Sequence, residues 1–331
     1  MPKPNIAVFG CGYWGQNLVR NFHHLGHLAL VCDPAEAGRR RAGELAPGVP
    51  VTASFDEAFA NRDIDAIVFA TPAETHHPLT LRALAAGRDV LVEKPMALTH
   101  AQGAEMLRVA EQHGRILMVG HLLEYHPAVV RLRQLIAAGE LGKICYLYSN
   151  RLNFGKVRIE ENALWSFAPH DIAVILRLCG ELPVEVTCVG GSYLTPNLAD
   201  VTVSGLHFRG GQRAHIFVSW LNPFKEQQLV IVGDRKMAVF NDVEKDRKLV
   251  LYDQRVDLDG RQPVLQKGEA HVVTLPSDEP LRLECQHFID CIVTRRTPLT
   301  DAASGLRVLK VLESCQVSLQ LNGQPIHLLE S

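Results

Sequence analysis

The chain has 331 residues, of which 47% are hydrophobic and 21% charged, and its formal net charge is -2. This length allows two domains, and the small net charge without a basic face argues against a nucleic-acid partner. No apolar run could span a bilayer, and the start lacks the apolar region of a signal peptide. The 8 cysteines show neither metal-ligand spacing nor a disulfide framework. We therefore expect a cytoplasmic protein with reduced thiols, without a bound metal or a membrane partner.

A glycine-rich turn follows the first predicted strand, Ile6–Phe9, and precedes a predicted helix. It has the pattern Gly-x-Gly-x-x-Gly, in which the first glycine allows the tight turn, the second lets a pyrophosphate approach and the third lets helix and strand pack closely. The N–H groups at the helix start face the anion. We expect this turn to bind a dinucleotide, and its residues are Gly10, Cys11, Gly12, Tyr13, Trp14 and Gly15.

An acidic residue ends the second predicted strand. Asp33 lies 23 residues past Gly10, near the ~20 expected for the carboxylate that binds the ribose hydroxyls of a dinucleotide. The alternative role for Asp33 is to cap a helix. Its charge would repel a 2′-phosphate, so we expect NAD as the cofactor and NADP less. Arg39, Arg40 and Arg41 could reach a phosphate, but within a helix-like stretch a solvated face fits them better.

Strands and helices continue to alternate up to residue 120. Further strands are predicted at residues 49–52, 66–70, 89–93 and 116–119, which makes six. This alternation predicts an α/β fold with a Rossmann-type, doubly wound parallel sheet. Ligands of such a sheet bind at the carboxyl ends of its strands.

Two of these strand ends carry polar residues. Thr71, Pro72 and His76 follow one strand, and Glu93, Lys94 and Pro95 close the next. They stand on the expected ligand edge, and we count His76 and Lys94 among the candidate cofactor-binding residues. Pro95 keeps Lys94 out of helical geometry, so we expect Lys94 to lie where cofactor and substrate meet. In isolation, Glu93 and Lys94 would be interpreted as a solvated ion pair, and His76 as a surface residue at a helix start.

The alternation stops near Gly120, so we expect a NAD-binding domain at residues 1–121 and a second domain at 122–331. Strand follows strand from Val184 to His271, and helices at 281–295 and 302–321 close the chain. This order predicts an α+β domain with a large, mostly antiparallel sheet. We expect a cleft between the two halves to hold the substrate.

Part of this second sheet has no helix to cover it in the predicted order of elements. Val201, Val203, Ile216 and Val218 give its strands apolar faces. An uncovered apolar sheet is a typical interface between copies of one chain. The sequence therefore predicts a homodimer or a homotetramer.

Polar residues gather before an apolar helix predicted at residues 172–179. His170 and Asp171 stand at its start, Trp165 precedes them, and Arg151 and Asn153 lie on an earlier strand. A histidine titrates near neutrality and suits general acid/base work. The alternative is that Asp171 caps the helix and His170 is a packed surface residue. We expect these five residues, together with Lys94, to bind the substrate.

The motifs quoted above resemble those of the Gfo/Idh/MocA family of nicotinamide-dependent oxidoreductases. The resemblance rests on the glycine turn, the Ala-Thr-Pro-x-x-x-His strand end, the Glu93-Lys94-Pro95 triplet and the His170 motif, in that order along the chain. It implies that Lys94 and His170 form the catalytic pair, while Glu93, Thr71 and Pro72 line the nicotinamide. The family often has an aspartate four residues before the histidine, where this chain has Ser166.

A narrower resemblance covers Arg151–Gly155 and Trp165–Ile172. These stretches are similar to family members that resemble UDP-N-acetylglucosaminuronate 3-dehydrogenases, enzymes of surface polysaccharide synthesis. The resemblance implies hydride transfer between a ring carbon of a nucleotide sugar and NAD. Two alternatives stay open within the family: a dehydrogenase of a free polyol or inositol, and a ketoreductase of a TDP-sugar. The alternative from another class is a nicotinamide-bound sensor without turnover.

Overall fold

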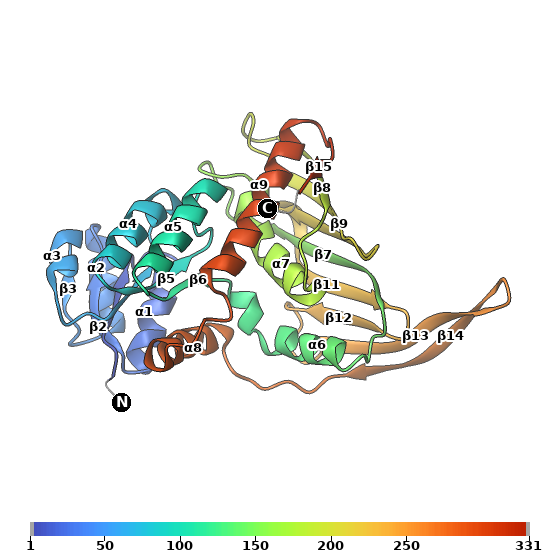
Figure 1. Ribbon diagram of the computed structural model, residues 1–331, viewed down its shortest axis with the longest axis horizontal. Coiled ribbons are helices and arrows are strands. Elements are labelled where there is room, and N and C mark those ends of the chain that lie inside the picture. The colour runs from blue at the N-terminus through green and yellow to red at the C-terminus, as the bar shows by residue number, and fades with distance from the viewer. Residues whose placement is uncertain (1–2, 329–331) are drawn as a thin grey trace. The chain divides into compact units, whose positions relative to one another are not determined.

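A computed structural model describes residues 3–328 of the chain (Figure 1). The described residues divide into two compact units. Residues 3–125 and 278–309 form the first unit, and residues 126–277 and 310–328 form the second. No pattern in the sequence indicated that residues 278–309 return to the first unit.

The first unit contains a six-stranded, fully parallel sheet with the strand order β3-β2-β1-β4-β5-β6. This order confirms the predicted doubly wound sheet and puts β1 beside β4, where the direction of winding reverses. The strands are β1 (Ile6–Phe9), β2 (Leu28–Cys32), β3 (Val51–Thr52), β4 (Ala66–Phe69), β5 (Asp89–Glu93) and β6 (Leu117–Gly120).

Helices connect these strands, as parallel pairing requires. They are α1 (Gly15–His24), α2 (Glu36–Leu45), α3 (Phe55–Ala60), α4 (Ala73–Ala85) and α5 (His100–Gln112). After the last strand, this unit also contains the 3₁₀ turn η1 (Leu122–Tyr125) and, later in the chain, α8 (Pro280–Thr294). Ser54 caps α3, because its side chain accepts a hydrogen bond from the Glu57 amide. Gly87 takes the left-handed conformation after α4, with φ +76°.

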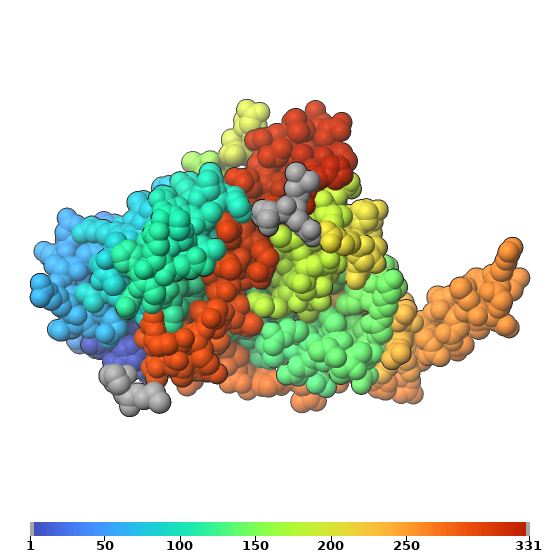
Figure 2. All heavy atoms as spheres, in the orientation of Figure 1, coloured from blue at the N-terminus to red at the C-terminus, as the bar shows by residue number. Residues whose placement is uncertain are grey.

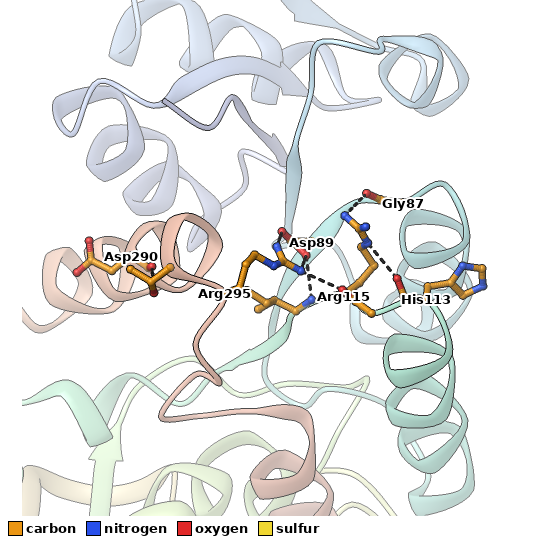
Figure 3. Close-up of polar contacts among 9 residues, drawn as sticks. Gly87, Asp89, His113, Arg115, Asp290 and Arg295 are labelled. Atoms are coloured by element: carbon orange, nitrogen blue, oxygen red, sulfur yellow. Dashed lines mark hydrogen bonds and ion pairs between the residues drawn. The ribbon is translucent and has the colours of Figure 1, made fainter. Parts of the chain in front are cut away.

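The return of α8 is fixed at the amino end of β5, on the side of the sheet away from the expected ligand edge. Arg295, just past α8, forms an ion pair with Asp89, the first residue of β5 (Figure 3). The same arginine donates a hydrogen bond to the Gly114 carbonyl at 2.9 Å, and Asp89 accepts one from the Ile116 amide at 2.9 Å. These contacts leave the carboxyl ends of the strands to a ligand.

The second unit contains a nine-stranded sheet with the order β14-β13-β12-β11-β7-β10-β9-β8-β15. Its pairs are antiparallel apart from β7 with β10, which confirms the predicted mostly antiparallel sheet. The strands are β7 (Ile144–Phe154), β8 (Glu185–Gly191), β9 (Val201–His207), β10 (Arg213–Ser219), β11 (Leu221–Gly233), β12 (Met237–Asn241), β13 (Leu249–Asp259), β14 (Gln262–Val272) and β15 (Ile326–His327).

Helices α6 (Pro127–Ala137) and α7 (Ala163–Cys179) belong to this unit, and α9 (Ala302–Gln320) begins in the first unit and ends in the second. α7 packs on β7, β9 and β10. Ile216 and Val218 are buried, and in the strand register they lie opposite Ser204 and Thr202. Val201 and Val203 therefore point to the other face, since neighbouring residues of a strand alternate. The three valines and the isoleucine of the prediction are therefore divided between the two faces of the sheet.

The start of α7 corrects the prediction of a helix from residue 172. The helix begins at Ala163, where the Asn162 side chain accepts a hydrogen bond from the Trp165 amide. Pro169 lies inside this helix. His170 and Asp171 are therefore interior helical residues, so the capping alternative for Asp171 is wrong. A proline usually lies at or before a helix start, and Pro169 is tolerated here within the first half of the helix.

Candidate active site

The glycine turn between β1 and α1 shows which of its glycines the protein itself requires. Gly10 has φ +92°, and a Cβ added there would lie 2.6 Å from the Ala70 carbonyl oxygen. A Cβ at Gly15 would lie 2.1 Å from the Gly10 oxygen. At Gly12, by contrast, no described atom beyond its chain neighbours comes within 4 Å of an added Cβ. Gly12 borders open space, which is what a bound pyrophosphate needs.

Asp33 is held beside this turn at the end of β2. One carboxylate oxygen accepts a hydrogen bond from the Cys11 amide at 2.7 Å, and the other accepts one from the Ala35 amide at 2.8 Å. A Cβ at Gly38 would lie 2.2 Å from Asp33 Oδ2, so α2 approaches the carboxylate closely only because residue 38 is glycine. The predicted ribose ligand and the glycine turn are thus parts of one connected structure.

Two of the three arginines of α2 turn back toward this site. Arg39 Nη1 donates hydrogen bonds to the carbonyls of Asp33 and Pro34, at 3.0 and 2.6 Å. Arg41 Nη1 donates to the Cys11 carbonyl, inside the glycine turn. The predicted solvated face is therefore wrong for Arg39 and Arg41, and it holds for the exposed Arg40. Periodicity misplaced them because a long side chain can reach backward along its helix.

His76 connects two turns at the ligand edge. Its Nδ1 lies 2.8 Å from the Pro95 carbonyl oxygen, and its Nε2 lies 2.9 Å from the Thr71 carbonyl oxygen. Burial lowers the pKa of His76, while the two carbonyls act in the opposite direction. The surface alternative for His76 is wrong, because the residue is buried. The side chain links the turn after β4, which holds Thr71 and Pro72, to the turn after β5.

Glu93 connects the Lys94 turn to the glycine turn. The Trp14 indole N–H donates a hydrogen bond to one oxygen of Glu93, and the Lys94 amide donates to the other at 3.2 Å. Burial raises the pKa of Glu93, and the Trp14 hydrogen bond and the Lys94 charge oppose this shift. The solvated alternative is wrong for Glu93, which is buried, while Lys94 is half-buried and its peptide bond to Pro95 is cis. The first unit thus brings the turns after β1, β4 and β5 together, with Tyr13 and Trp14 exposed on the first.

The second unit brings Arg151 and Asp171 into a buried ion pair. Arg151 Nε donates to Asp171 Oδ2 at 2.7 Å, and Nη2 donates to Oδ1 at 3.1 Å. The Ser149 hydroxyl adds a hydrogen bond to Oδ1 at 2.6 Å. Burial opposes the charge of Arg151, but Asp171 raises its pKa overall. Two predicted substrate ligands are therefore bound to each other, and they join β7 to α7 just after His170.

Trp165 and Asn153 complete the predicted set in this unit. The Trp165 indole N–H donates to Gln316 Oε1 at 3.1 Å, and Asn162 Nδ2 donates to the same oxygen at 2.8 Å. Asn153 Oδ1 is buried and has no hydrogen-bond partner within residues 3–328. Gln316 was missed by the sequence analysis, because α9 is far from Trp165 along the chain and no motif marks this glutamine.

Among the described residues, no group of three histidine, cysteine, aspartate or glutamate side chains could hold a metal ion. Within the same part of the chain, every helix is too short or too polar to cross a membrane.

Two family models match the chain. The model of an oxidoreductase family with a NAD-binding Rossmann fold, GFO_IDH_MocA, covers residues 4–121, and the model of the GFO/IDH/MocA C-terminal domain covers residues 129–239. The first match supports a NAD site at the glycine turn. It includes Asp33, His76 and Lys94, and the second match includes His170.

Similar proteins of known activity include several enzymes. UDP-N-acetylglucosamine 3-dehydrogenase of Acidithiobacillus ferrooxidans is 27% identical over 317 residues, which are 95% of this chain and 96% of that protein. Its solved structure has a TM-score of 0.84 at 26% identity and covers 97% of this chain and 99% of that one. A 2,7-anhydro-N-acetylneuraminate hydratase of Mediterraneibacter gnavus is 30% identical over 203 residues, 58% of this chain and 54% of that protein. An inositol 2-dehydrogenase of Corynebacterium glutamicum is 26% identical over 190 residues, 55% of this chain and 56% of that protein.

Proposed function

Because the chain belongs to the GFO/IDH/MocA family of NAD-binding oxidoreductases, we propose that it oxidises a ring hydroxyl of a nucleotide-activated sugar. The substrate class we favour is a UDP-linked N-acetylglucosamine or its uronate, oxidised at the 3-position. The similarity to UDP-N-acetylglucosamine 3-dehydrogenase over 95% of the chain carries this choice. The matches to the hydratase and to the inositol dehydrogenase cover only 58% and 55% of the chain.

The first unit would hold NAD along the carboxyl ends of β1, β2, β4 and β5. We assign the pyrophosphate to the open space at Gly12 and the adenosine ribose to Asp33. Thr71, Pro72 and Glu93 would line the nicotinamide. NAD, when bound, supplies the hydride acceptor. The residues of the chain then have to place the sugar carbon and remove the hydroxyl proton.

Lys94 would hold and polarise the reacting oxygen. An ammonium group beside an alkoxide stabilises the negative charge that grows as the proton departs. Glu93 fixes the start of this turn through the Lys94 amide, and His76 fixes its other end through the Pro95 carbonyl. We propose that Lys94 and His170 share the proton transfer. His76 would position the turn, with its ring nitrogens remaining at hydrogen-bond distance from the Pro95 and Thr71 carbonyl oxygens.

The second unit would bind the sugar and its anionic groups. Asp171 engages Nε and Nη2 of Arg151, which leaves Nη1 for a carboxylate or a phosphate of the substrate. We propose that Asn153 Oδ1 accepts a hydrogen bond from a sugar hydroxyl or amide, since a buried polar atom without a partner is costly. Trp165 would pack against the sugar ring.

One observation favours a second candidate function. Ser166 stands where many family members have an aspartate four residues before the histidine, and a serine cannot act as a carboxylate base. A nicotinamide-bound sensor without turnover would need no such acid. Dehydrogenases of a free polyol or an inositol, and TDP-sugar ketoreductases, are the alternatives with turnover.

The proposal also includes a cellular compartment, a biosynthetic role and an oligomeric state. We propose a cytoplasmic enzyme of surface polysaccharide synthesis. All eight cysteines are free thiols in the structure, as expected in a reducing compartment. We also propose a homodimer or homotetramer, supported by Val203, Val189 and Tyr146, which are exposed on the sheet of the second unit.

The proposal is tested by absorbance of reduced nicotinamide with NAD and a panel of substrates. The panel holds UDP-N-acetylglucosamine, its uronate, a TDP-sugar, myo-inositol and scyllo-inositol. We expect turnover with a UDP-sugar and at least tenfold lower kcat/KM with the inositols. Preference for an inositol would replace the substrate assignment. Calorimetric binding of NAD without turnover of any panel member would favour the sensor.

A further inference from the structure

Trp14 lies at the junction of the glycine turn and α1, and its side chain does not cap that helix. Its indole N–H donates a hydrogen bond to Glu93 Oε1. In the strand order of the sheet, β4 lies between β1 and β5, so this bond reaches past the end of β4. The two strand ends that it joins are about 10 Å apart, because neighbouring strands are spaced by about 4.8 Å. One side chain thus connects the turn that would hold the cofactor to the turn that carries Lys94.

The carboxylate of Glu93 has little room to move away from Trp14. Glu93 and Gly120 are register partners on β5 and β6, and a Cβ added at Gly120 would lie 2.9 Å from Glu93 Oε2. The Lys94 amide donates to the same oxygen at 3.2 Å, while Trp14 donates to Oε1. The close backbone of β6 therefore keeps the carboxylate at its two N–H donors.

These two hydrogen bonds indicate which protonation state of Glu93 the site fits. An ionised carboxylate accepts at both oxygens, whereas a neutral carboxyl group carries a hydrogen on one of them. Trp14 and the Lys94 amide approach different oxygens, so a proton on either oxygen would weaken one of the two bonds. The geometry therefore fits an ionised Glu93 as long as both donors are present.

Buried acidic groups from other elements interact with Glu93. α8 packs on α1 and on η1, and in Figure 2 its side chains form a closed surface below α5 on this face of the first unit. α8 carries Glu284, whose charge interacts with that of Glu93, and η1 carries the buried Glu124, which interacts with Glu284. Cys285 also lies near Glu93, and burial raises the pKa of its thiol, which stays neutral. Negative charge on either acid favours a neutral Glu93.

Two groups act in the opposite direction. Burial raises the pKa of Glu93, and the Trp14 hydrogen bond lowers it more strongly than the Lys94 charge does. In the reaction proposed above, Lys94 takes part in proton transfer, so its charge is not constant. The indole N–H cannot be lost in this way. Trp14 is therefore the permanent donor that favours the ionised carboxylate.

We propose that Trp14 is a positioning residue for the reaction: it keeps Glu93 ionised and in place, and Glu93 in turn holds the amide of the Lys94 turn. The inference rests on the proposed function, because that function assigns Lys94 to the reacting oxygen. Without the indole N–H, Glu93 takes up a proton at a higher pH. Lys94 then loses its anionic neighbour, and the reacting oxygen is held less well.

The test compares the parent chain with Trp14→Phe, which keeps an aromatic ring and removes the N–H. The measured quantity is kcat from about pH 5.5 to 9.5 with NAD and the preferred sugar. The active form has an ionised Glu93, so loss of a donor should move the acid limb of kcat upward by about one pH unit. The rate should be about tenfold lower below both midpoints and approach the parental rate above them. General damage to packing would lower the rate equally at every pH.

Trp220→Phe is the matched control in the second unit. It removes a similar bond, from the Trp220 indole N–H to Asp200 Oδ1 at 2.6 Å, and should leave the acid limb in place. In a Glu93→Gln background, adding Trp14→Phe should cause no further shift of the limb. NAD affinity of Trp14→Phe should stay within about threefold of the parent, because the ring is kept.

A readout without turnover separates this inference from the proposed function. The chain has three tryptophans, so the emission of Trp14 is the difference between the parent and Trp14→Phe. This emission should change over the pH range in which Glu93 is protonated, and Glu93→Gln should abolish the change. Absence of turnover with every sugar would overturn the proposed function and leave the titration in place. A Trp14 emission that does not depend on pH, or equal acid limbs in the parent and Trp14→Phe, would overturn the inference.

Discussion

At the scale of single residues, the glycine turn separates positions needed by the fold from a position needed by a ligand. Gly10 and Gly15 have backbone atoms within 2.6 and 2.1 Å of an added Cβ, and Gly12 has open space. The sequence pattern treats the three glycines alike. Only the structure shows that a side chain at residue 12 would disturb the bound cofactor more than the protein.

Gly12→Val should therefore fold like the parent chain and lose NAD binding. We expect an unchanged melting temperature within about 2 °C and at least a hundredfold loss of affinity by calorimetry. Gly15→Val is the matched control, because its side chain meets the Gly10 carbonyl and should lower the stability of the protein itself. A folded Gly12→Val variant with parental NAD affinity would refute the pyrophosphate assignment.

Cofactor choice also depends on single residues. Asp33 should give NAD a preference over NADP of at least tenfold in kcat/KM, which is about 1.4 kcal/mol, because its charge repels a 2′-phosphate. Arg39 already lies at the Asp33 carbonyl. Asp33→Ser should therefore move the preference toward NADP, and adding Arg39→Ala should reverse that gain. A kcat/KM of the parent chain with NADP that equals or exceeds the value with NAD would show that Arg39 or a neighbour overrides Asp33.

At the scale of elements, α8 places a carboxyl group inside the first unit. Glu284 is fully buried, and both its oxygens are without hydrogen-bond partners in the described chain. Burial raises the pKa of Glu284 well above its usual value, and the nearby charges of Glu93 and Glu124 add to the shift. The periodicity of α8 gave no sign of this, since an isolated glutamate in a helix is usually solvated.

A raised folded-state pKa has a definite consequence for stability. Between the unfolded pKa, near ~4.3, and the raised folded pKa, the folded state binds more protons than the unfolded state. The free energy of unfolding therefore falls as pH rises through this window. Glu284→Gln keeps the shape of the neutral acid without its ionisation. We expect the variant to melt at a higher temperature than the parent at pH 8 and at nearly the same temperature at pH 4.5.

The control for this experiment is Glu111→Gln, a change of an exposed glutamate on α5. It should leave the pH dependence of melting unchanged. A Glu284→Gln variant that is less stable than the parent at pH 8 would show that the ionised carboxylate is satisfied in the folded protein.

At the scale of the whole molecule, the sequence predicted the fold more completely than the site. The apolar strands and glycine stops of the first half fix a parallel sheet, and the run of strands after Val184 fixes the second sheet. The return of α8 depends on Arg295 and Asp89, which are 206 residues apart and carry no local signal. The α7 start was missed because Pro169 is tolerated inside a helix.

The site was predicted in its parts and not in its connections. Motifs identified Gly12, Asp33, His76 and Lys94, which are close to strand ends and therefore visible in the order of elements. They could not show that His76 bridges two carbonyls or that Arg151 is paired with Asp171. Such contacts depend on the packing of distant segments, and a sequence pattern has a short range.

The central claim is that Lys94 acts on the reacting oxygen. Lys94→Met keeps most of the side-chain volume and removes the charge, so it should leave the adenosine end of the cofactor site intact. The direct measurement is single-turnover reduction of NAD by the preferred sugar, with NAD affinity determined in parallel. We predict that the variant binds NAD within a few-fold of the parent. Its rate of NAD reduction should fall by a factor on the order of 10² or more, as when one preorganised polar group is removed. A Lys94→Met variant that reduces NAD at the parental rate would contradict the account.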